Sequence, residues 1–489
     1  MLRSNRSNRL NRIFNLILGL YFGVTLFLGA GWYFYSLSAP STSLSAFHAV
    51  LLFTITIGAA SALFFLFDRV DRNIEKITFD PVRAFILLDF FLLAVQLLIA
   101  RSMPFTPRND LSYVCHGAKN LVLRGPGYIN SGLPKYHHHY FYTYPNNQMI
   151  LVIIAGLYKI EYTLTGGFSN AAPTLFNVLN INLSIVFLFA TAQKIYGDKR
   201  ALWCAFKCLC FLPAFSYIPF FYTDTMAMPW LMGAVYFYIS WRTRCDQDSD
   251  YNLSRSAFLY LGLSAGLLVV AYKIKGSAGL LLPVFLCDMV FHNPKLKNKI
   301  AYLIYILYTA VLFVAVLKIT NALLMKGLQL RESDIQRYQF PMIHWVMMSA
   351  SGSGGFHKSD FLYTLKHPGQ AAKTNADWSR LYKKLRSTPK FLRHMRGKIG
   401  RTWGDGTFMS AHYMPVLKHL RFKITANIFY FAMFFDMEWT FVKERASRVR
   451  IQGHSNVFKL ALWILALFLL IWESKSRYLV TFLPLWALI

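Results

Sequence analysis

Isolated carboxylates beside apolar runs are the residues best suited to chemistry in this 489-residue chain. Asp110 is the only acid in residues 101–145, and Asp224 stands in a polar turn between two apolar runs. A carboxylate surrounded by cations stays ionised, so it could accept a proton or hold a cation. Each acid could instead cap a helix, at Asn109-Asp110 or before Thr225. The spacing alone leaves both interpretations open.

Cations at apolar boundaries form a second group of candidates. Lys273 and Lys275 lie in a hairpin between two apolar runs, and Arg477 follows another run near the end of the chain. An ammonium or a guanidinium in such a place is suited to phosphate oxygens. Two ordinary alternatives remain: the lysines could snorkel to a membrane interface, and Glu473 could pair with Arg477 along a helix.

Aromatic and glycine-rich motifs occur in the long stretch between residues 323 and 424. His344 and Trp345 precede a Gly/Ser run, and Trp403 and Asp405 lie in the motif WGDGTF. Aromatic rings form platforms for the C–H faces of sugars, so Trp403, Asp405 and His344 are candidate substrate contacts. Turn chemistry alone would also account for these motifs.

The composition shows which elements must position these residues. Hydrophobic residues make up 55% of the chain and charged residues only 15%, which argues against a soluble globule. The formal charge is +30, but the basic residues lie between apolar runs and no basic stretch is long enough to form its own domain. We therefore exclude nucleic acid as a partner and expect anionic lipid headgroups or a lipid-linked phosphate.

Apolar runs long enough to cross a membrane recur along the chain. The predicted spans are 13–36, 44–67, 83–100, 172–193, 201–220, 225–241, 257–272, 276–292, 300–322, 425–441 and 456–473. Two further runs, 146–161 and 478–489, are short. We expect an all-α polytopic bundle of about 11–13 transmembrane helices with two long extracytoplasmic loops.

Basic loops predict which ends of the spans face the cytoplasm. The N-terminus and the loops at 193–200, 292–299 and 442–450 are basic and are placed inside. The long loops 101–145 and 323–424 then lie outside, together with Asp224, Lys273, Lys275 and Arg477. Three apolar runs lie between the loop 101–145 and Asp224, but two segments on the same side of a membrane need an even number of crossings between them. The short run 146–161 is therefore expected not to span.

The loops and spans together predict four parts of the chain. Residues 1–82 form an N-terminal two-span extension, and 83–322 form the transmembrane core with its first outer loop. Residues 323–424 form a long extracytoplasmic region, and 425–489 form the C-terminal membrane segments.

The order of these motifs resembles a known superfamily. The residues that carry the likeness are Asp110, Val114, Ala118, Gly125, the YPNN motif at 144–147, the YTDT motif at 222–225, the lysine hairpin, WGDGTF and the ExxxRY motif at 473–478. Together they resemble the GT-C superfamily of integral-membrane glycosyltransferases, and more closely its bacterial members similar to protein O-mannosyltransferases (family 39-like). The likeness covers most of the chain from about residue 85 onward.

The resemblance implies an inverting transfer of a sugar from a polyprenyl-phosphate donor to an acceptor hydroxyl on the extracytoplasmic face of a bacterial plasma membrane. Asp110 would be the general base or a metal-proximal acid, and Asp224 the second acid. Arg477, with Lys273 or Lys275, would hold the donor phosphate. The implied substrate contacts are Tyr144, Asn146, Asn147, His344, Trp403 and Asp405. The acceptor would be a glycan, a lipid or a protein in the cell envelope.

One departure from the family pattern concerns metal binding. Many relatives have two adjacent acids where this chain has Asn109-Asp110. A divalent cation, Mg²⁺ or Mn²⁺, at Asp110 and Asp224 therefore stays an open alternative. A transporter or flippase of lipid-linked glycans is the second functional hypothesis, but it would favour charges at span centres and inverted repeats.

Overall fold

The computed structural model describes residues 2–39, 42, 44–103, 105–247, 253–291, 299–386, 388–414, 417–446 and 455–489. The regular secondary structure in these ranges is helical, without strands. Of the predicted basic loops, 292–298 and 447–450 lie outside the described residues, whereas 442–446 continue helix α21 (Leu420–Ala446).

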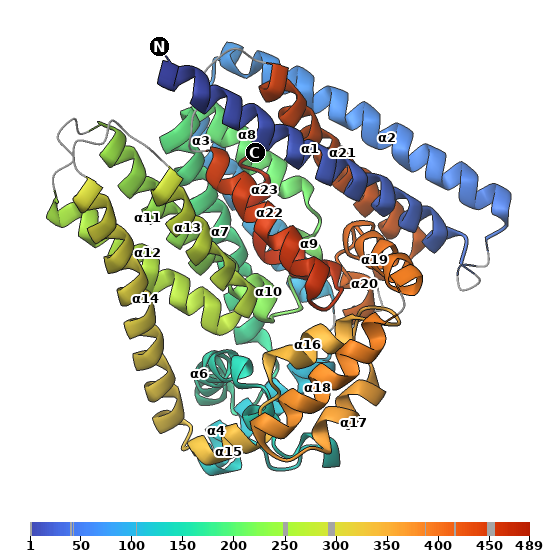
Figure 1. The fold of residues 1–489 in the computed structure, drawn as a ribbon, viewed down its shortest axis with the longest axis vertical. Coiled ribbons are helices and arrows are strands. Elements are labelled where there is room, and N and C mark those ends of the chain that lie inside the picture. Colours follow the sequence, from blue (N-terminus) through green and yellow to red (C-terminus); the bar gives the residue numbers. More distant parts are fainter. Residues whose placement is uncertain are drawn as a thin grey trace.

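The long helices form a bundle that fills the upper part of Figure 1. They are α1 (Leu2–Leu37), α2 (Ala46–Asn73), α3 (Pro81–Ser102), α7 (Ala171–Tyr196), α11 (Met228–Gln247), α12 (Arg255–Ile274), α14 (Lys299–Gly327), α21 (Leu420–Ala446) and α22 (Ser455–Ile471), and the shorter α13 (Leu281–Phe291) lies among them. Shorter helices complete this part, namely α8 (Asp198–Cys210), α9 (Pro213–Ser216), α10 (Thr223–Met226) and α23 (Leu483–Trp486).

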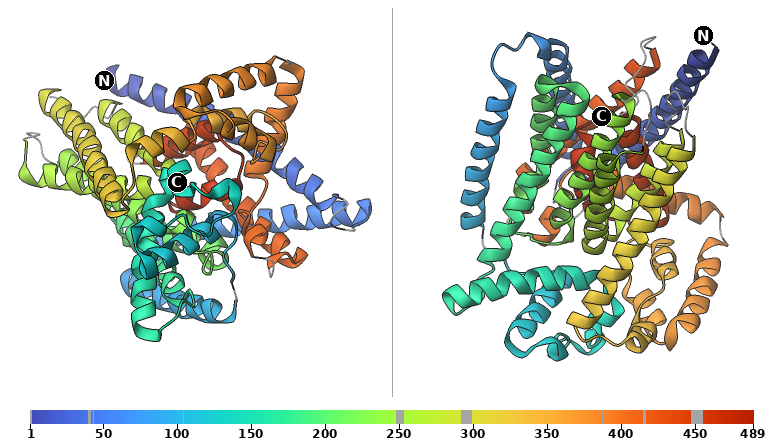
Figure 2. Two further views of the ribbon diagram at one scale, coloured as in Figure 1. Left: turned by 90° about the horizontal axis from the view of Figure 1, so that it is seen from below. Right: turned by 90° about the vertical axis from the view of Figure 1, so that its left-hand side faces the viewer.

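A second group of helices lies below the bundle in Figure 1 and in the right-hand view of Figure 2. From the first predicted loop onward it contains α4 (Asn109–Arg124), α5 (Tyr140–Thr143) and α6 (Gln148–Thr165). The second predicted loop adds α15 (Glu332–Tyr338), α16 (Met342–Ser349), α17 (Lys358–Leu365), α18 (Gly369–Leu385), α19 (Thr388–Trp403) and α20 (Ser410–Tyr413). Both regions are thus ordered, helical structure.

Seven helices in the described residues are long and apolar enough to cross a membrane. They are α1, α2, α3, α6, α7, α12 and α14, with Gly276–Phe291 and Ser455–Ile471 as shorter apolar helices. The chain is therefore an all-α polytopic membrane protein. Fewer helices meet the length and hydropathy requirement than the 11–13 expected. One reason is that the run at 276–292 begins with a 3₁₀ turn, so α13 has only 11 residues.

The predicted span 201–220 is wrong as a continuous helix. Helix α8 ends at Cys210, and Pro213 begins the four-residue helix α9. Proline lacks an N–H and disfavours helical geometry before it, so the helix cannot continue through this point. The chain then reaches Asp224 as short turns whose residues are almost all buried. Irregular backbone at membrane depth is tolerated where protein surrounds it.

Helix α6 contains residues 148–161 of the short run 146–161 and lies across the bundle. Figure 1 views α6 almost end-on, whereas α7 and α11 run along the picture; the right-hand view of Figure 2 shows α6 lying horizontally. Its length and hydropathy would suffice for a span. Its direction instead places it at the end of the bundle that carries α4 and α15.

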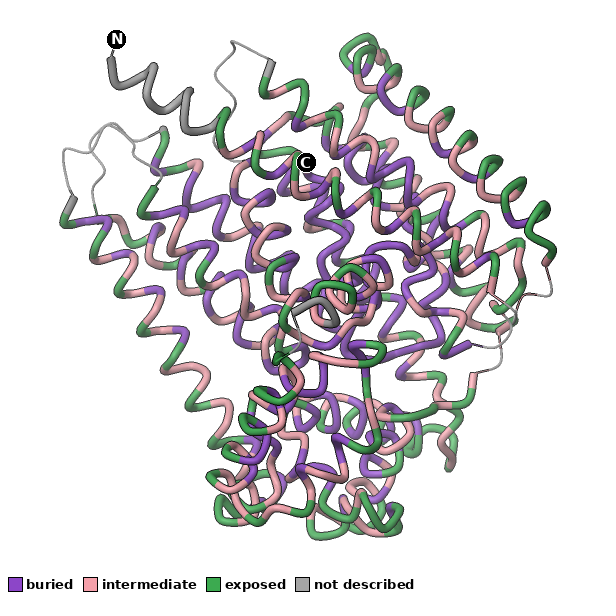
Figure 3. Tube along the Cα trace, turned by 45° about the vertical axis from the view of Figure 1, so that its right-hand side comes forward, coloured by how far each residue is buried: buried purple, intermediate pink, exposed green. Residues whose placement is uncertain are grey.

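The N-terminal pair of helices packs on the C-terminal part of the chain. Figure 1 shows α1, α2 and α21 side by side. The hydroxyls of Tyr33 and Thr56 are 3.0 Å apart between α1 and α2, and Lys443 on α21 donates to Asp68 on α2 at 2.6 Å. Figure 3 shows buried residues running through the centre of the bundle and into the lower helices.

Candidate active site

The centre of the site is a buried ion pair between two of the predicted residues. Lys275 Nζ lies 2.5 Å from Asp224 Oδ1, and the side chain of Asp224 has no exposed surface. Asp224 belongs to α10, and Lys275 follows α12 directly. The other oxygen, Oδ2, is buried without a hydrogen-bond partner in the described residues. The two side chains therefore form a close ion pair, but one carboxylate oxygen of Asp224 lacks a hydrogen bond from any described group.

Arg477 lies in the same site inside a cage of phenol rings. Its Nη1 donates to the Tyr413 hydroxyl at 2.7 Å, and its guanidinium lies over the rings of Tyr222, Tyr413 and Tyr478 at 5.7, 5.2 and 5.7 Å. The 3₁₀ segment Ser476–Phe482 carries Arg477. Its Nε is buried without a hydrogen-bond partner among the described groups. An anion with several oxygens would satisfy this donor.

Asp110 is connected to this centre by a chain of hydrogen bonds. Tyr222 donates to Asn147 Oδ1 at 3.0 Å, Asn147 Nδ2 donates to the Tyr140 hydroxyl at 2.7 Å, and Tyr140 donates to Asp110 Oδ1 at 3.0 Å. Every donor in the chain points toward the carboxylate. Because such bonds polarise one another, the chain couples Asp110 to Tyr222 through Tyr140 and Asn147.

Tyr222 lies between the two acids. Burial raises its pKa well above the ordinary value, the charges of Asp110 and Asp224 raise it further, and Arg477 acts in the opposite direction. The pKa of Tyr140 is raised for the same main reason, burial, with Asp110 adding to it. Both phenols therefore stay protonated at neutral pH and act as fixed hydrogen-bond donors.

Burial lowers the pKa of Lys275 to about 8, although the charge of Asp224 opposes the shift. Arg477 and Lys475 lower it further by charge repulsion. The site thus holds more positive charge than Asp224 alone neutralises. An anionic group placed here would gain from both cations.

Partly exposed rings lie next to the acids. Tyr144 is 5.0 Å from Tyr140 and 6.0 Å from Trp345, and Trp345 is 6.2 Å from Trp472, all between ring centroids. Tyr144 also interacts electrostatically with Asp110 and Glu473. This aromatic row connects α5, α16 and the end of α22, and its rings keep some contact with solvent.

Two predicted substrate contacts are contradicted by burial. Trp403 is 1% exposed and packs on Phe22, Phe434 and Trp486, so it is a core residue and no sugar platform. His344 is 1% exposed, and its Nδ1 lies 2.8 Å from the Thr364 hydroxyl within the second long loop. Sequence cannot distinguish a buried tryptophan from an exposed one when both lie beside glycines.

Three other predicted residues act differently from the expectation. Asp405 accepts hydrogen bonds from Met409 N at 3.0 Å and from Ser476 Oγ at 2.8 Å, so it fixes a turn beside Arg477. Lys273 donates to Asn321 on α14 at 2.8 Å and does not join Lys275 at Asp224. Asn146 is exposed and donates to the neighbouring Asn147 at 3.3 Å.

The capping alternatives for the acids are wrong. Helix α4 has Arg108 at its N-cap and α10 has Tyr222, and neither helix has a side-chain cap bond. Glu473 does not pair with Arg477 either: it lies 2.7 Å from Lys475 Nζ and accepts a 2.6 Å bond from Tyr478. These pairings lower the pKa of Glu473 even though burial raises it.

The described side chains fit a resident divalent cation poorly. They contain no group of three or more His, Cys, Asp or Glu residues that could hold a metal ion. Lys275 covers one oxygen of Asp224, and Tyr140 and Asn147 separate that acid from Asp110. A hard cation prefers several converging oxygens, and this donor set offers one free carboxylate oxygen at Asp224.

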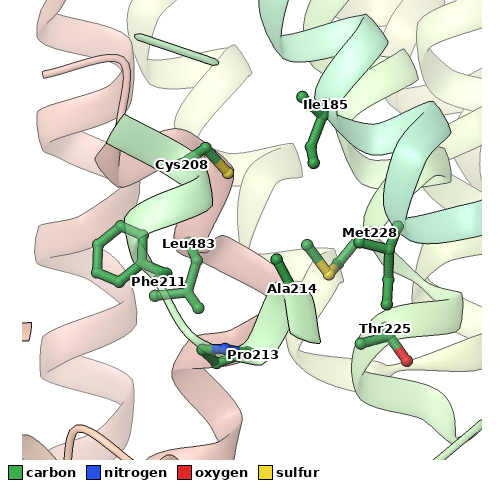
Figure 4. Close-up of a pocket in the computed structure, with 9 residues that line it drawn as sticks. Ile185, Cys208, Phe211, Pro213, Ala214, Thr225, Met228 and Leu483 are labelled. Atoms are coloured by element: carbon green, nitrogen blue, oxygen red, sulfur yellow. The ribbon is translucent and has the colours of Figure 1, made fainter. Parts of the chain in front are cut away.

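A small apolar pocket is lined by Thr225, the neighbour of Asp224 in the chain (Figure 4). Its lining is Ile181, Ile185, Cys208, Phe211, Pro213, Ala214, Thr225, Met228 and Leu483. Thr225, next to Asp224 in the chain, donates to Asn177 Oδ1 at 2.5 Å. The pocket contains no charged side chain, so it is a feature of packing beneath the site.

Several site residues were not assigned a role from sequence. Tyr140 and Tyr413 lie in the two predicted outer loops, and nothing in their spacing marks them as partners of Asp110 or Arg477. The one signal was proximity: Tyr222 and Tyr478 adjoin the motifs that contain Asp224 and Arg477.

A family model described as "Conserved hypothetical integral membrane protein" (CHIM_prot) matches residues 6–489. The chain belongs to this family. As a member of the CHIM_prot family it is an integral membrane protein, in agreement with its apolar helices. No curated protein matches its sequence.

Two solved structures are similar to this CHIM_prot member at low identity. The archaeal oligosaccharyltransferase AglB from Archaeoglobus fulgidus, in complex with an inhibitory peptide and a dolichol-phosphate, is 13% identical with a TM-score of 0.42. That match covers 82% of this chain and 50% of AglB, so the chain spans about half of its length. ArnT from Cupriavidus metallidurans, bound to undecaprenyl phosphate, is 12% identical with a TM-score of 0.31, and that match covers 83% of this chain and 76% of ArnT.

Proposed function

We propose that this protein is a GT-C-type glycosyltransferase that moves a sugar from a polyprenyl-phosphate carrier to an acceptor hydroxyl. The observation that carries the proposal is the convergence of Asp110, Asp224, Lys275 and Arg477 from four distant segments. Two acids and two cations, linked by buried phenols, are what an enzyme needs to deprotonate a hydroxyl and stabilise a phosphate leaving group.

Asp110 is the proposed general base. It is partly exposed, so an acceptor can approach it, and the Tyr140 donor orients its carboxylate. The acceptor oxygen attacks the anomeric carbon while its proton passes to Asp110. A new carbon–oxygen bond forms as the bond between the anomeric carbon and the phosphate oxygen breaks. Direct displacement of this kind inverts the anomeric configuration.

Arg477 is the proposed phosphate ligand. The electron pair of the broken bond leaves on the phosphate oxygen, where negative charge develops. The free Nε of Arg477 and the neighbouring Lys275 stabilise that charge in a buried site, where electrostatic interactions are stronger than in water. Lys273 lies apart and is not included in this role.

Lys275 is proposed to take the place of a divalent cation at Asp224. Its ammonium neutralises the carboxylate, and its position over the Tyr478 ring, at 4.4 Å, holds it in place. Transfer is therefore expected to proceed without added Mg²⁺ or Mn²⁺.

The sugar is proposed to stack on the aromatic row of Tyr144, Trp345 and Trp472. These rings replace the predicted platform at Trp403. Asn147 and Asp405, which were expected to contact substrate, are instead proposed to position Tyr140 and Ser476. The site is proposed to lie on the extracytoplasmic face, because the short basic loops predict the opposite ends as cytoplasmic. The proposal of a bacterial plasma membrane comes from the resemblance to bacterial enzymes. The acceptor is proposed to be a cell-envelope glycan, lipid or protein.

The direct test uses purified protein in detergent with a panel of radiolabelled polyprenyl-phosphate sugars and a crude envelope acceptor. Wild type should release free polyprenyl phosphate and label the acceptor with at least one donor. A variant Arg477→Gln should bind that donor much more weakly. If no donor in the panel is consumed or bound, and vesicles containing the protein instead move the lipid-linked sugar between leaflets, the proposal is overturned in favour of a flippase.

A further inference from the structure

The stretch from residue 378 to residue 404 contains basic residues and no acid. The basic residues are Arg380, Lys383, Lys384, Arg386, Lys390, Arg393, Arg396, Lys398 and Arg401. This stretch comprises the second half of α18 and all of α19, in the region predicted to lie outside the cell. Positive charge is normally concentrated in short cytoplasmic loops, so this basic segment requires another explanation.

Some of these cations have structural roles. Arg380 and Lys384 both bind Asp360, at 2.7 and 2.8 Å, and hold α18 against α17. Lys398 is 1% exposed and donates to Ser349 Oγ at 3.1 Å. These contacts stabilise the fold of the lower helices and leave other cations of the segment unexplained.

Four other described cations are exposed, have no carboxylate partner in the described chain, and lie beside exposed apolar side chains. They are Lys383, Arg386, Arg393 and Arg396. The neighbouring apolar residues are Trp378, Tyr382, Leu385 and Leu392, which are 56, 64, 40 and 63% exposed. On α18, Trp378, Tyr382 and Leu385 follow one face, because side chains four and seven positions apart align on a helix. We call these eight residues the basic–aromatic surface.

Helix α19 carries Leu392, Arg393 and Arg396 of this surface and packs on α1 near the end of a candidate span. Gly400 packs so closely on α1 that an added Cβ would lie 3.0 Å from Leu28 O and from the Trp32 side chain. Arg401 lies over the Trp32 ring at 5.3 Å. Residues 32–35 of α1 are Trp-Tyr-Phe-Tyr, near the end of a candidate span. Aromatic residues at a span end mark the membrane interface.

The direction of α19 agrees with an interfacial position. Figure 1 views α19 almost end-on beside the far end of α1, which runs along the picture, so the two helices cross at a large angle. A helix that crosses a span at its aromatic end runs along the membrane surface. Basic residues combined with Trp, Tyr and Leu are typical of helices that bind anionic lipid headgroups.

We infer that the basic–aromatic surface binds the anionic headgroups of the surrounding membrane and holds the helices α15–α20 over the candidate site. The inference does not depend on the proposed reaction, because it rests on charge, exposure and the contact with α1. A soluble polyanion, such as an anionic glycan, is the rival occupant with the same charge.

The test is a spin label at Leu392, introduced as Leu392→Cys in full-length protein reconstituted in nanodiscs. The discs contain phosphatidylcholine alone or phosphatidylcholine mixed with phosphatidylglycerol. Accessibility to oxygen, which enters lipid, is compared with accessibility to a water-soluble nickel complex. Labelling of the native cysteines, which are buried or half-buried, is measured on the wild type and subtracted as background.

The inference predicts that the label becomes more accessible to oxygen and less to nickel as phosphatidylglycerol is added. Replacing Lys383, Arg386, Arg393 and Arg396 with Gln should abolish this dependence. The matched control, Lys358→Gln with Lys366→Gln on the exposed side of α17, should preserve it. A label that stays accessible to nickel in both discs overturns the inference, as does a label that responds to a soluble anionic polysaccharide and not to lipid.

Discussion

The ammonium of Lys275 lies 2.5 Å from the carboxylate of Asp224, and both side chains are buried. Removing one charge from such a pair leaves the other uncompensated, which typically destabilises a protein by about 3–5 kcal/mol. Lys275→Met should therefore lower the unfolding temperature in detergent. Asp224→Asn combined with Lys275→Met should restore most of the stability. Transfer should stay lost in the double variant; if it returned with stability, the pair would have a purely structural role.

The hydrogen-bond chain to Asp110 predicts a kinetic effect at Tyr140. Tyr140→Phe keeps the ring packing and removes the donor at 3.0 Å. Hydrogen bonds to charged groups contribute about 1.5–3 kcal/mol, so kcat should fall by about tenfold or more. Tyr113→Phe, on a ring 5.0 Å from Tyr140, serves as the matched control and should leave kcat unchanged. An unchanged rate in Tyr140→Phe would remove the chain from the mechanism.

The lowered pKa of Lys275 predicts a pH dependence of donor binding. Lys275 is charged below its pKa of about 8, so affinity for the polyprenyl-phosphate donor should fall as the pH rises through that value. Folding lowers this pKa from 10.5, so between about 8 and 10.5 the unfolded chain binds more protons. The contribution of Lys275 to the free energy of unfolding therefore increases with pH in this range. Loss of folded protein through the titration of Lys275 thus cannot explain a weaker binding of the donor at high pH. Donor Kd measured from pH 6 to pH 9.5 checks the prediction, and a flat profile contradicts it.

Gly354 predicts a positioning effect on the segment that carries Arg477. Its φ is +70°, and an added Cβ would lie 2.6 Å from Ser474 Oγ. Gly354→Ala should cost about 1 kcal/mol from the backbone strain and should also displace residues 473–477. Gly369→Ala has a similar φ, +74°, with open space around its Cβ, so it shows the strain alone. Donor affinity should fall only in Gly354→Ala, and equal behaviour of the two variants would contradict the positioning role.

The aromatic row predicts opposite outcomes for two tryptophans. Trp345→Ala should weaken the binding of sugar donors while leaving the unfolding temperature nearly unchanged, because Trp345 is partly exposed. Trp403→Ala should destabilise the protein by about 3–5 kcal/mol, because it opens a cavity in the core. Thermal unfolding and donor binding of both variants separate the two roles. A stable Trp403→Ala variant that no longer binds donor would restore the platform assigned to it from sequence.

Hydropathy and charge predicted the polytopic, all-helical architecture and the common end of the bundle at which Asp110, Asp224, Lys275 and Arg477 lie. The broken segment after Cys210 was not predictable from apolar content, because buried irregular backbone is as apolar as a helix. The roles of Trp403 and His344 were predicted wrongly because their motifs suit both a turn and a ligand site. Tertiary packing alone decides whether such a motif forms a turn or a ligand site. It also decides the partners of Lys273 and Lys275, which are two residues apart but bind Asn321 and Asp224.

The most direct measurement compares wild type, Asp110→Asn and the exposed-acid control Glu332→Gln in single-turnover transfer with saturating donor. Asp110→Asn keeps the size and the hydrogen-bond partner of the side chain but removes the base. General-base catalysis contributes about 10²–10⁴-fold, so transfer should fall by that factor while donor binding and unfolding temperature match the wild type and Glu332→Gln. Transfer by Asp110→Asn at the wild-type rate would contradict the account.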